Sequence, residues 1–136
     1  MARVEVKRQS GLTSGLLKLI WIVKMNHERE LTELAAKAAG ILGKWSERGN
    51  CILITDCAGM SWEWWRPLED DGCAMRLAVS LGLIIDIDTD ESWTDVDFTV
   101  NYEDRTIREG HGLADALGAT RLAIVRAAAE IGRSVP

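Results

Sequence analysis

The chain has 136 residues, of which 47% are hydrophobic and 27% are charged, as expected for one globular domain with an ordinary core. Its net charge of −5 is unevenly distributed, because residues 1–24 carry a net +4 and the rest of the chain therefore carries −9. Nucleic-acid binding depends on Lys and Arg neutralising phosphates. The acidic balance argues against direct nucleic-acid binding and favours a basic protein surface or a small molecule in a local pocket.

The first 24 residues combine basic side chains with a short apolar run, Leu16–Val23. Lys18 interrupts this run, which is far shorter than the roughly 18 residues of a membrane span, so we expect no membrane segment. Two interpretations remain: an extra strand at the edge of the sheet, or a non-native leader that precedes a native start at Met25. The charge change favours the second, and we divide the chain into an extension, 1–24, and a single domain, 25–136.

The domain is predicted to open with a helix. Asn26 is a suitable N-cap, acidic residues follow in the first turn, and apolar residues recur at helical spacing until Gly40 or Gly43 ends the helix. Cys51–Thr55 then forms a short apolar strand. Residues 58–66 are predicted to be a loop rich in tryptophan.

A second helix is predicted from Pro67 to Leu81, capped by Asp70 or Asp71 and stopped by Gly82. Two strands, 83–88 and 95–103, should follow as a hairpin. Alternation in the second strand places one set of side chains on the core, namely Val96, Phe98, Val100 and Tyr102. A last helix is predicted over 113–132. Its inward stripe consists of Leu117, Ile124, Ala128 and Ile131.

This order of elements, α-β-α-β-β-α, predicts an α+β fold. Three helices pack with a small, mostly antiparallel sheet of three to four strands. The strands have wet acidic faces, and these favour helices on one face of the sheet only.

Three segments, 34–40, 65–81 and 119–132, carry a resemblance to known proteins. They are similar to the patterns L-A-A-K-A-A-G, W-x-P-L-x-D-D-G-D-A-x-R-L-A-V-x-L and A-T-R-x-A-I-V-R-A-A-A-E-I-G of a family of small tailed-phage and prophage accessory proteins. That family usually has Asp where this chain has Cys73. The resemblance implies a phage or prophage origin, a location in the cytoplasm of the infected host and an α/β/α sandwich. It implies no reaction.

The segment around the second helix start is the candidate ligand-binding site. Indole rings stack on nucleobases or anchor protein interfaces, and a helix start can hold an anion beside a carboxylate that accepts ribose hydroxyls. The structural alternative is that the indoles fill the core and the carboxylates only cap the helix. The candidate residues are Trp62, Trp64, Trp65, Arg66, Asp70, Asp71 and Arg76.

Acidic residues on the predicted hairpin form a candidate docking face for a basic partner: Asp86, Asp88, Asp97 and Glu103. A plain solvated face is the alternative. The series Asp86-x-Asp88-x-Asp90 offers oxygen ligands for a cation, but Glu91 stands where an EF-hand loop needs Gly. Cys51, Cys57 and Cys73 lack C-x-x-C spacing. We therefore predict buried thiols and no metal site.

No catalytic motif is present, and His111, with Asp104 or Glu109 nearby, is the single plausible acid or base. We therefore predict a non-catalytic protein without a cofactor that binds a host protein or a nucleotide-like small molecule, with a site that two subunits of a homo-oligomer could share. Such a protein would act as a host-modulating or counter-defence factor. The alternatives are a small enzyme that uses His111 with nearby acids, and a phage structural component.

Overall fold

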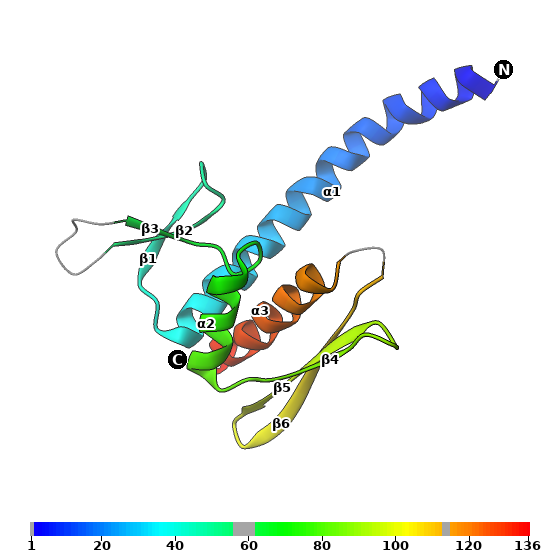
Figure 1. Cartoon of the computed structure of the whole chain (residues 1–136). Coiled ribbons are helices and arrows are strands. Elements are labelled where there is room, and N and C mark those ends of the chain that lie inside the picture. The colour runs from blue at the N-terminus through cyan, green and yellow to red at the C-terminus, as the bar shows by residue number, and fades with distance from the viewer. Residues whose placement is uncertain (1, 56–61, 113–114) are drawn as a thin grey trace. The chain divides into compact units, whose positions relative to one another are not determined.

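The computed structural model describes residues 2–55, 62–112 and 115–136 (Figure 1). These residues form three helices and two three-stranded antiparallel sheets. The chain divides into two units, residues 1–30 and residues 31–136, and helix α1 (Ala2–Ala39) runs through the division. In the first unit, the apolar side chains between Leu16 and Val23 are exposed on the helix. No helix in the described ranges has a stretch both long enough and apolar enough for a membrane crossing.

The last turns of α1 belong to the second unit and pack into its core. Leu31, Ala35 and Ala36 are buried there at helical spacing. The helix stops before Gly40, whose φ of 69° suits glycine, and the Ile41 amide donates a hydrogen bond to the Ala36 carbonyl at 2.9 Å. Of the two predicted stops, Gly40 and Gly43, the structure uses Gly40.

The first sheet consists of β1 (Gly43–Ser46), β2 (Cys51–Thr55) and β3 (Trp62–Trp65), in that order. Both pairings are antiparallel. Ile52 lies opposite Trp65, and the two side chains are buried in the same apolar cluster as the helices. An aromatic side chain opposite a β-branched one stabilises an antiparallel pair, so this contact joins the first sheet to the core.

Helix α2 (Asp71–Leu81) has the caps that the sequence predicts. The Asp70 carboxylate accepts a hydrogen bond from the Cys73 amide at 2.9 Å, which satisfies one of the free donors of the first turn. Gly82 ends the helix with a φ of 65°, and its amide donates to the Val79 carbonyl at 3.2 Å. The buried face of α2 consists of Cys73, Ala74, Leu77 and Ala78.

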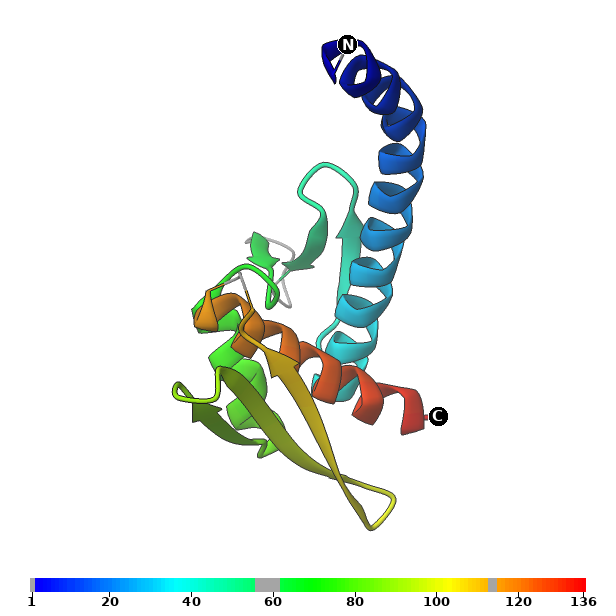
Figure 2. The same ribbon diagram turned by 90° about the vertical axis from the view of Figure 1, so that its right-hand side faces the viewer.

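The second sheet is formed by β4 (Ile84–Asp88), β5 (Trp93–Val100) and β6 (Glu103–Gly110), with β5 in the centre (Figure 2). All pairings are antiparallel. Asn101 and Tyr102 form the turn between β5 and β6, and both have positive φ angles, as a type I′ turn requires. The inner face of β5 is buried and carries Thr94, Val96, Phe98 and Val100.

Helix α3 (Ala116–Ser134) lies at the centre of the second unit. It packs on β5 and β6 with one side and on α2 with another (Figure 2). Ala127, Ala128 and Ala129 are all fully buried. Since successive residues of an α-helix point about 100° apart, three consecutive buried residues show that neighbours surround this part of α3.

Helices α1 and α3 approach each other closely at Gly132. A Cβ atom at this position would overlap the main-chain carbonyl oxygen of Leu34 and would lie 2.8 Å from the carbonyl carbon. The obstacle is backbone, so no change of rotamer can relieve it. Position 132 therefore requires glycine, although glycine is a weak helix former.

The α+β class with three helices and antiparallel strands is confirmed. The structure contains three strands that the sequence did not indicate, namely β1, β3 and β6. Strand β3 lies within the predicted Trp-rich loop, of which residues 58–61 are outside the described ranges. Helices lie on the inner face of the second sheet only, so the described residues do not form an α/β/α sandwich (Figure 2).

Several predicted boundaries differ from the structure. Helix α2 begins at Asp71 and not at Pro67, and β5 begins at Trp93 and not at Asp95. Residues 2–24 are helical and not an edge strand, so α1 does not begin at Asn26. The predicted strand 95–103 ends at Val100, because the chain turns at 101–102 and leaves Tyr102 fully exposed. The last helix begins at Ala116, after the Asp115 cap, and the predicted start at Leu113 is outside the described residues.

We expect Gly132→Ala to lower the free energy of unfolding by about 1–3 kcal/mol, the usual range for overpacking, even though alanine has the higher helix propensity. Urea denaturation followed by circular dichroism measures this change. Gly15→Ala is the control, because Gly15 is also helical and a Cβ atom there meets nothing within 4 Å. Equal or higher stability of Gly132→Ala would contradict the close helix crossing.

Candidate functional site

The tryptophans of the predicted site do not form one surface. Trp65 is 5% exposed and lies in the core, whereas Trp64 is 43% exposed on the other face of β3. The Trp64 ring covers Gly49, where a Cβ atom would collide with it, and the Arg66 guanidinium lies 5.4 Å from the ring centroid. Trp62 contributes its backbone to β3, and its side chain is outside the described part. The structure thus separates Trp64 from Trp65.

Charged groups at the start of α2 are occupied with local contacts. Hydrogen bonds with Cys73 hold the pKa of the Asp70 carboxyl below its ordinary value. The Arg76 guanidinium lies 4.0 Å from that carboxylate and 3.6 Å from the Cys73 sulfur. Burial raises the pKa of the Cys73 thiol. An anion bound at this helix start would have to displace the Asp70 carboxylate, so the geometry gives it no vacant site.

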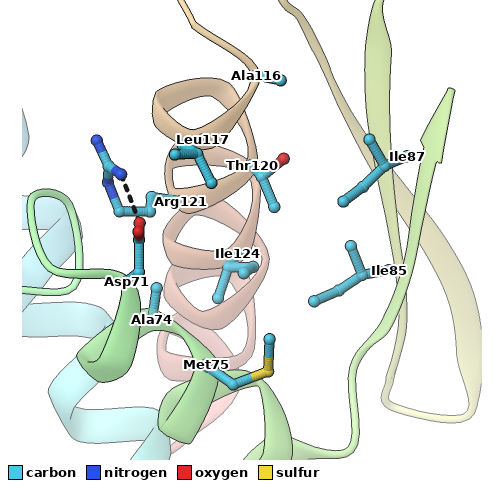
Figure 3. A pocket seen from close by; sticks show the side chains of 10 residues that line it. All are labelled: Asp71, Ala74, Met75, Ile85, Ile87, Ala116, Leu117, Thr120, Arg121 and Ile124. Atoms are coloured by element: carbon cyan, nitrogen blue, oxygen red, sulfur yellow. Dashed lines mark hydrogen bonds and ion pairs between the residues drawn. The ribbon is translucent and has the colours of Figure 1, made fainter. Parts of the chain in front are cut away.

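The structure instead forms a groove between α2, α3 and β4, with a cavity of about 390 Å³ (Figure 3). Most of its lining is apolar, and an ion pair stands at one end. Of the seven predicted ligand-binding residues, only Asp71 lines this groove. The lining residues are Asp71, Ala74, Met75, Ile85, Ile87, Ala116, Leu117, Thr120, Arg121 and Ile124.

Large apolar side chains around the groove are open to solvent. Leu117 is 60% exposed, Met75 56% and Ile87 49%, and each comes from a different element. Single exposed apolar residues are ordinary, but several around one cavity mark a binding surface. The prediction that Leu117 faces the core with Ile124 is wrong. Leu117 lies in the first turn of α3, where it lines the groove opposite the isoleucines of β4.

An ion pair closes one end of the groove. The Arg121 guanidinium donates to the Asp71 carboxylate at 2.6 Å (Figure 3). It also donates to the Leu68 carbonyl at 3.0 Å. The Arg121 side chain is mostly buried, whereas that of Asp71 is mostly exposed. These two contacts connect α3 to the start of α2 and so fix the positions of the two helices that form the walls of the groove.

A chain of buried polar groups lies behind the groove. The Thr94 hydroxyl is 2.9 Å from His111 Nε2 and 2.8 Å from the Thr120 hydroxyl, and Thr120 lines the groove. Thr94 is fully buried and His111 is 7% exposed. Of the two acids predicted to assist His111, Glu109 pairs with Arg126 and Asp104 accepts a hydrogen bond from Thr99. The hydrogen bonds of His111 and of the two predicted acids thus go to different partners.

Three of the four predicted docking acids share the outer face of the second sheet. The strand register places Asp86 opposite Asp95, and Asp88 and Asp97 on the same face. Asp97 also lines a more polar hollow of about 510 Å³. Glu103 lies opposite Val100, on the other face, 3.6 Å from Arg105.

One arginine partly neutralises this outer face. Arg108 donates to the Asp95 carboxylate at 2.7 and 2.8 Å and lies 4.0 Å from the Trp93 ring centroid. These hydrogen bonds lower the pKa of Asp95 and raise that of Arg108. Among the residues with described positions, no three His, Cys, Asp or Glu side chains are grouped to hold a metal ion. Cys57 is outside those residues.

No family model, curated protein or solved structure matches this chain. The functional argument therefore rests on the groove itself. Sequence reasoning missed its apolar lining, although one signal was available: Ile85 and Ile87 alternate with Asp86 and Asp88 along β4. Such alternation gives the strand one apolar face, and in the structure this face borders the groove.

The lowered pKa of Asp70 predicts a pH-dependent contribution to stability. The unfolded value is about 3.9, so the contribution is complete above that pH and is lost as pH falls through the lower folded pKa. Asp70→Asn keeps the cap without the titration. We expect its urea midpoint to fall less than that of the wild type between about pH 5 and pH 2. Asp86→Asn is the control, and identical behaviour of the two variants would contradict this role.

We expect Thr94→Val, which preserves shape, to lower the free energy of unfolding by about 1–3 kcal/mol, because it leaves His111 and Thr120 without their shared partner. Thr94→Ser keeps the hydroxyl and removes only a methyl group, so it is the matched comparison. Thermal and urea unfolding measure the stability of both variants. A larger loss in Thr94→Ser than in Thr94→Val would show that packing of the methyl group dominates.

Proposed function

We propose that this protein is a non-catalytic binding module whose α2–α3–β4 groove takes an apolar segment of a partner protein. The observation that carries the proposal is the apolar cavity of about 390 Å³, around which Met75, Ile87 and Leu117 remain about half exposed or more. Covering such side chains contributes about 25 cal/mol for each Å² of apolar surface removed from water. A partner with apolar side chains would supply the missing cover.

The chemistry of the groove favours a protein segment over a nucleotide. A nucleotide would need a cation for its phosphate and an aromatic surface for its base. The groove's own cation, Arg121, is committed to Asp71 and to the Leu68 carbonyl. Trp64 and Trp65 are not among the residues that line it. Binding of apolar side chains from a protein requires neither a free cation nor an aromatic surface.

The setting of this activity follows from the sequence motifs. In the phage or prophage context that they imply, the partner is a host protein, and the module acts in the host cytoplasm as a host-modulating or counter-defence factor. Binding without catalysis agrees with the site, since His111 is held in a satisfied buried network. The carboxylates predicted to assist it are bound elsewhere.

A random peptide library selected on the immobilised full-length protein tests the proposal. We expect enriched peptides whose affinity falls more than about tenfold in Leu117→Glu, because a carboxylate would be buried without a partner. Val79→Glu is the control, since Val79 is 73% exposed on α2 and is not part of the groove lining. Failure to enrich any peptide, or equal binding by Leu117→Glu, would contradict the proposed function.

A further inference from the structure

We propose that the partner segment binds as an additional strand on β4, and that its residues alternate between apolar and basic. This inference rests on the proposed function, because it requires the groove to be a protein-binding site. It adds the backbone conformation of the partner and the side-chain chemistry that the site selects.

The free edge of β4 supplies the backbone contacts. Among the described residues β4 pairs only with β5, so every second residue of β4 turns its N–H and C=O groups away from the sheet. Strand β6 is the other edge, but the groove lies beside β4. An extended segment on β4 would therefore gain main-chain hydrogen bonds and groove contacts together, as in other cases of strand addition.

The two faces of β4 differ in chemistry. Ile85 and Ile87 lie opposite Val96 and Thr94, on the inner face, and they line the groove. Asp86 and Asp88 point to the outer face. Side chains of a strand alternate between faces, so a strand added to β4 places one set over the groove and the other set beside the aspartates.

Negative charge on the outer face favours basic side chains at the partner positions beside Asp86 and Asp88. The Asp86 carboxylate has no cationic partner within the described ranges, and Asp88 accepts only the amides of Asp90 and Glu91, at 3.0 and 2.9 Å. The nearest cation on this face, Arg108, is bidentate with Asp95. Arg108 therefore compensates the charge of this face only in part, and Lys or Arg on the added strand would meet the carboxylates of Asp86 and Asp88.

The same charge argues against a second copy as the occupant. Two β4 strands paired edge to edge would bring Asp86 and Asp88 of one copy against those of the other. Like charges on neighbouring strands are destabilising. A heterologous basic and apolar segment meets no such repulsion, so we assign the groove to that partner.

Short capped peptides that alternate Lys with Ile or Val test the inference by fluorescence anisotropy and by amide chemical shifts of the full-length protein. We expect binding to weaken in Asp86→Lys by about fivefold, and to weaken with added salt. Methylation of alternate peptide nitrogens should weaken binding by about tenfold in one register and little in the other, because only every second N–H faces β4. Leu117→Glu should abolish binding, and Val79→Glu should not affect it.

The outcomes separate the two proposals. No binding of the alternating peptide, equal binding of a peptide of the same composition in block order, or indifference to methylation in both registers would overturn strand addition. If library-selected peptides still lost affinity in Leu117→Glu, the groove function would stand. A dimer that forms with rising protein concentration and is lost in Leu117→Glu, measured by sedimentation, would assign the groove to a second copy and overturn the inference.

Discussion

The close approach of α1 and α3 at Gly132 is the constraint on which the second unit depends. With no side chain at this position, the backbone of α3 reaches the Leu34 carbonyl, and the alanines of 127–129 can all be buried. A helix of small residues, surrounded in this way, brings α1, α2 and the second sheet close together. It then covers β5 and β6 and leaves β4 to one side. The groove is a consequence of this central position of α3.

The parts of the fold that depend on local signals could be predicted from the sequence. Asp70 and Gly82 define the ends of α2, because a cap acts through the residues next to it. Strands β1, β3 and β6, which were not predicted, carry weaker sequence signals. The strand Glu103–Gly110 is polar along most of its length, since one of its faces is open to solvent and Arg105 pairs with Glu130 at the edge of the other. Composition alone therefore does not reveal it, and only its pairing with β5 does.

The candidate site was harder to predict, because it depends on distant contacts. Asp71 and Arg121 lie 50 residues apart, and nothing in either segment indicates that they form the end of one groove. Leu117 follows the apolar stripe of α3 and reads as a core residue, and only the position of α3 on the sheet decides that it is exposed. The tryptophans show the opposite error. They cluster in the sequence and suggested one surface, but side chains alternate along β3, so Trp64 and Trp65 lie on opposite faces of the strand.

The aspartates of β4 connect the charge of the domain with the groove. An open edge strand with isoleucines is a risk, because it can pair with other copies and aggregate. Charged side chains on such an edge are a common protection, and Asp86 and Asp88 supply it here. Protection by one sign of charge is selective, since it repels the acidic chain itself and attracts a basic one. The acidic outer face and the apolar groove thus lie along the same edge strand, and any strand that approaches β4 meets carboxylates as well as isoleucines.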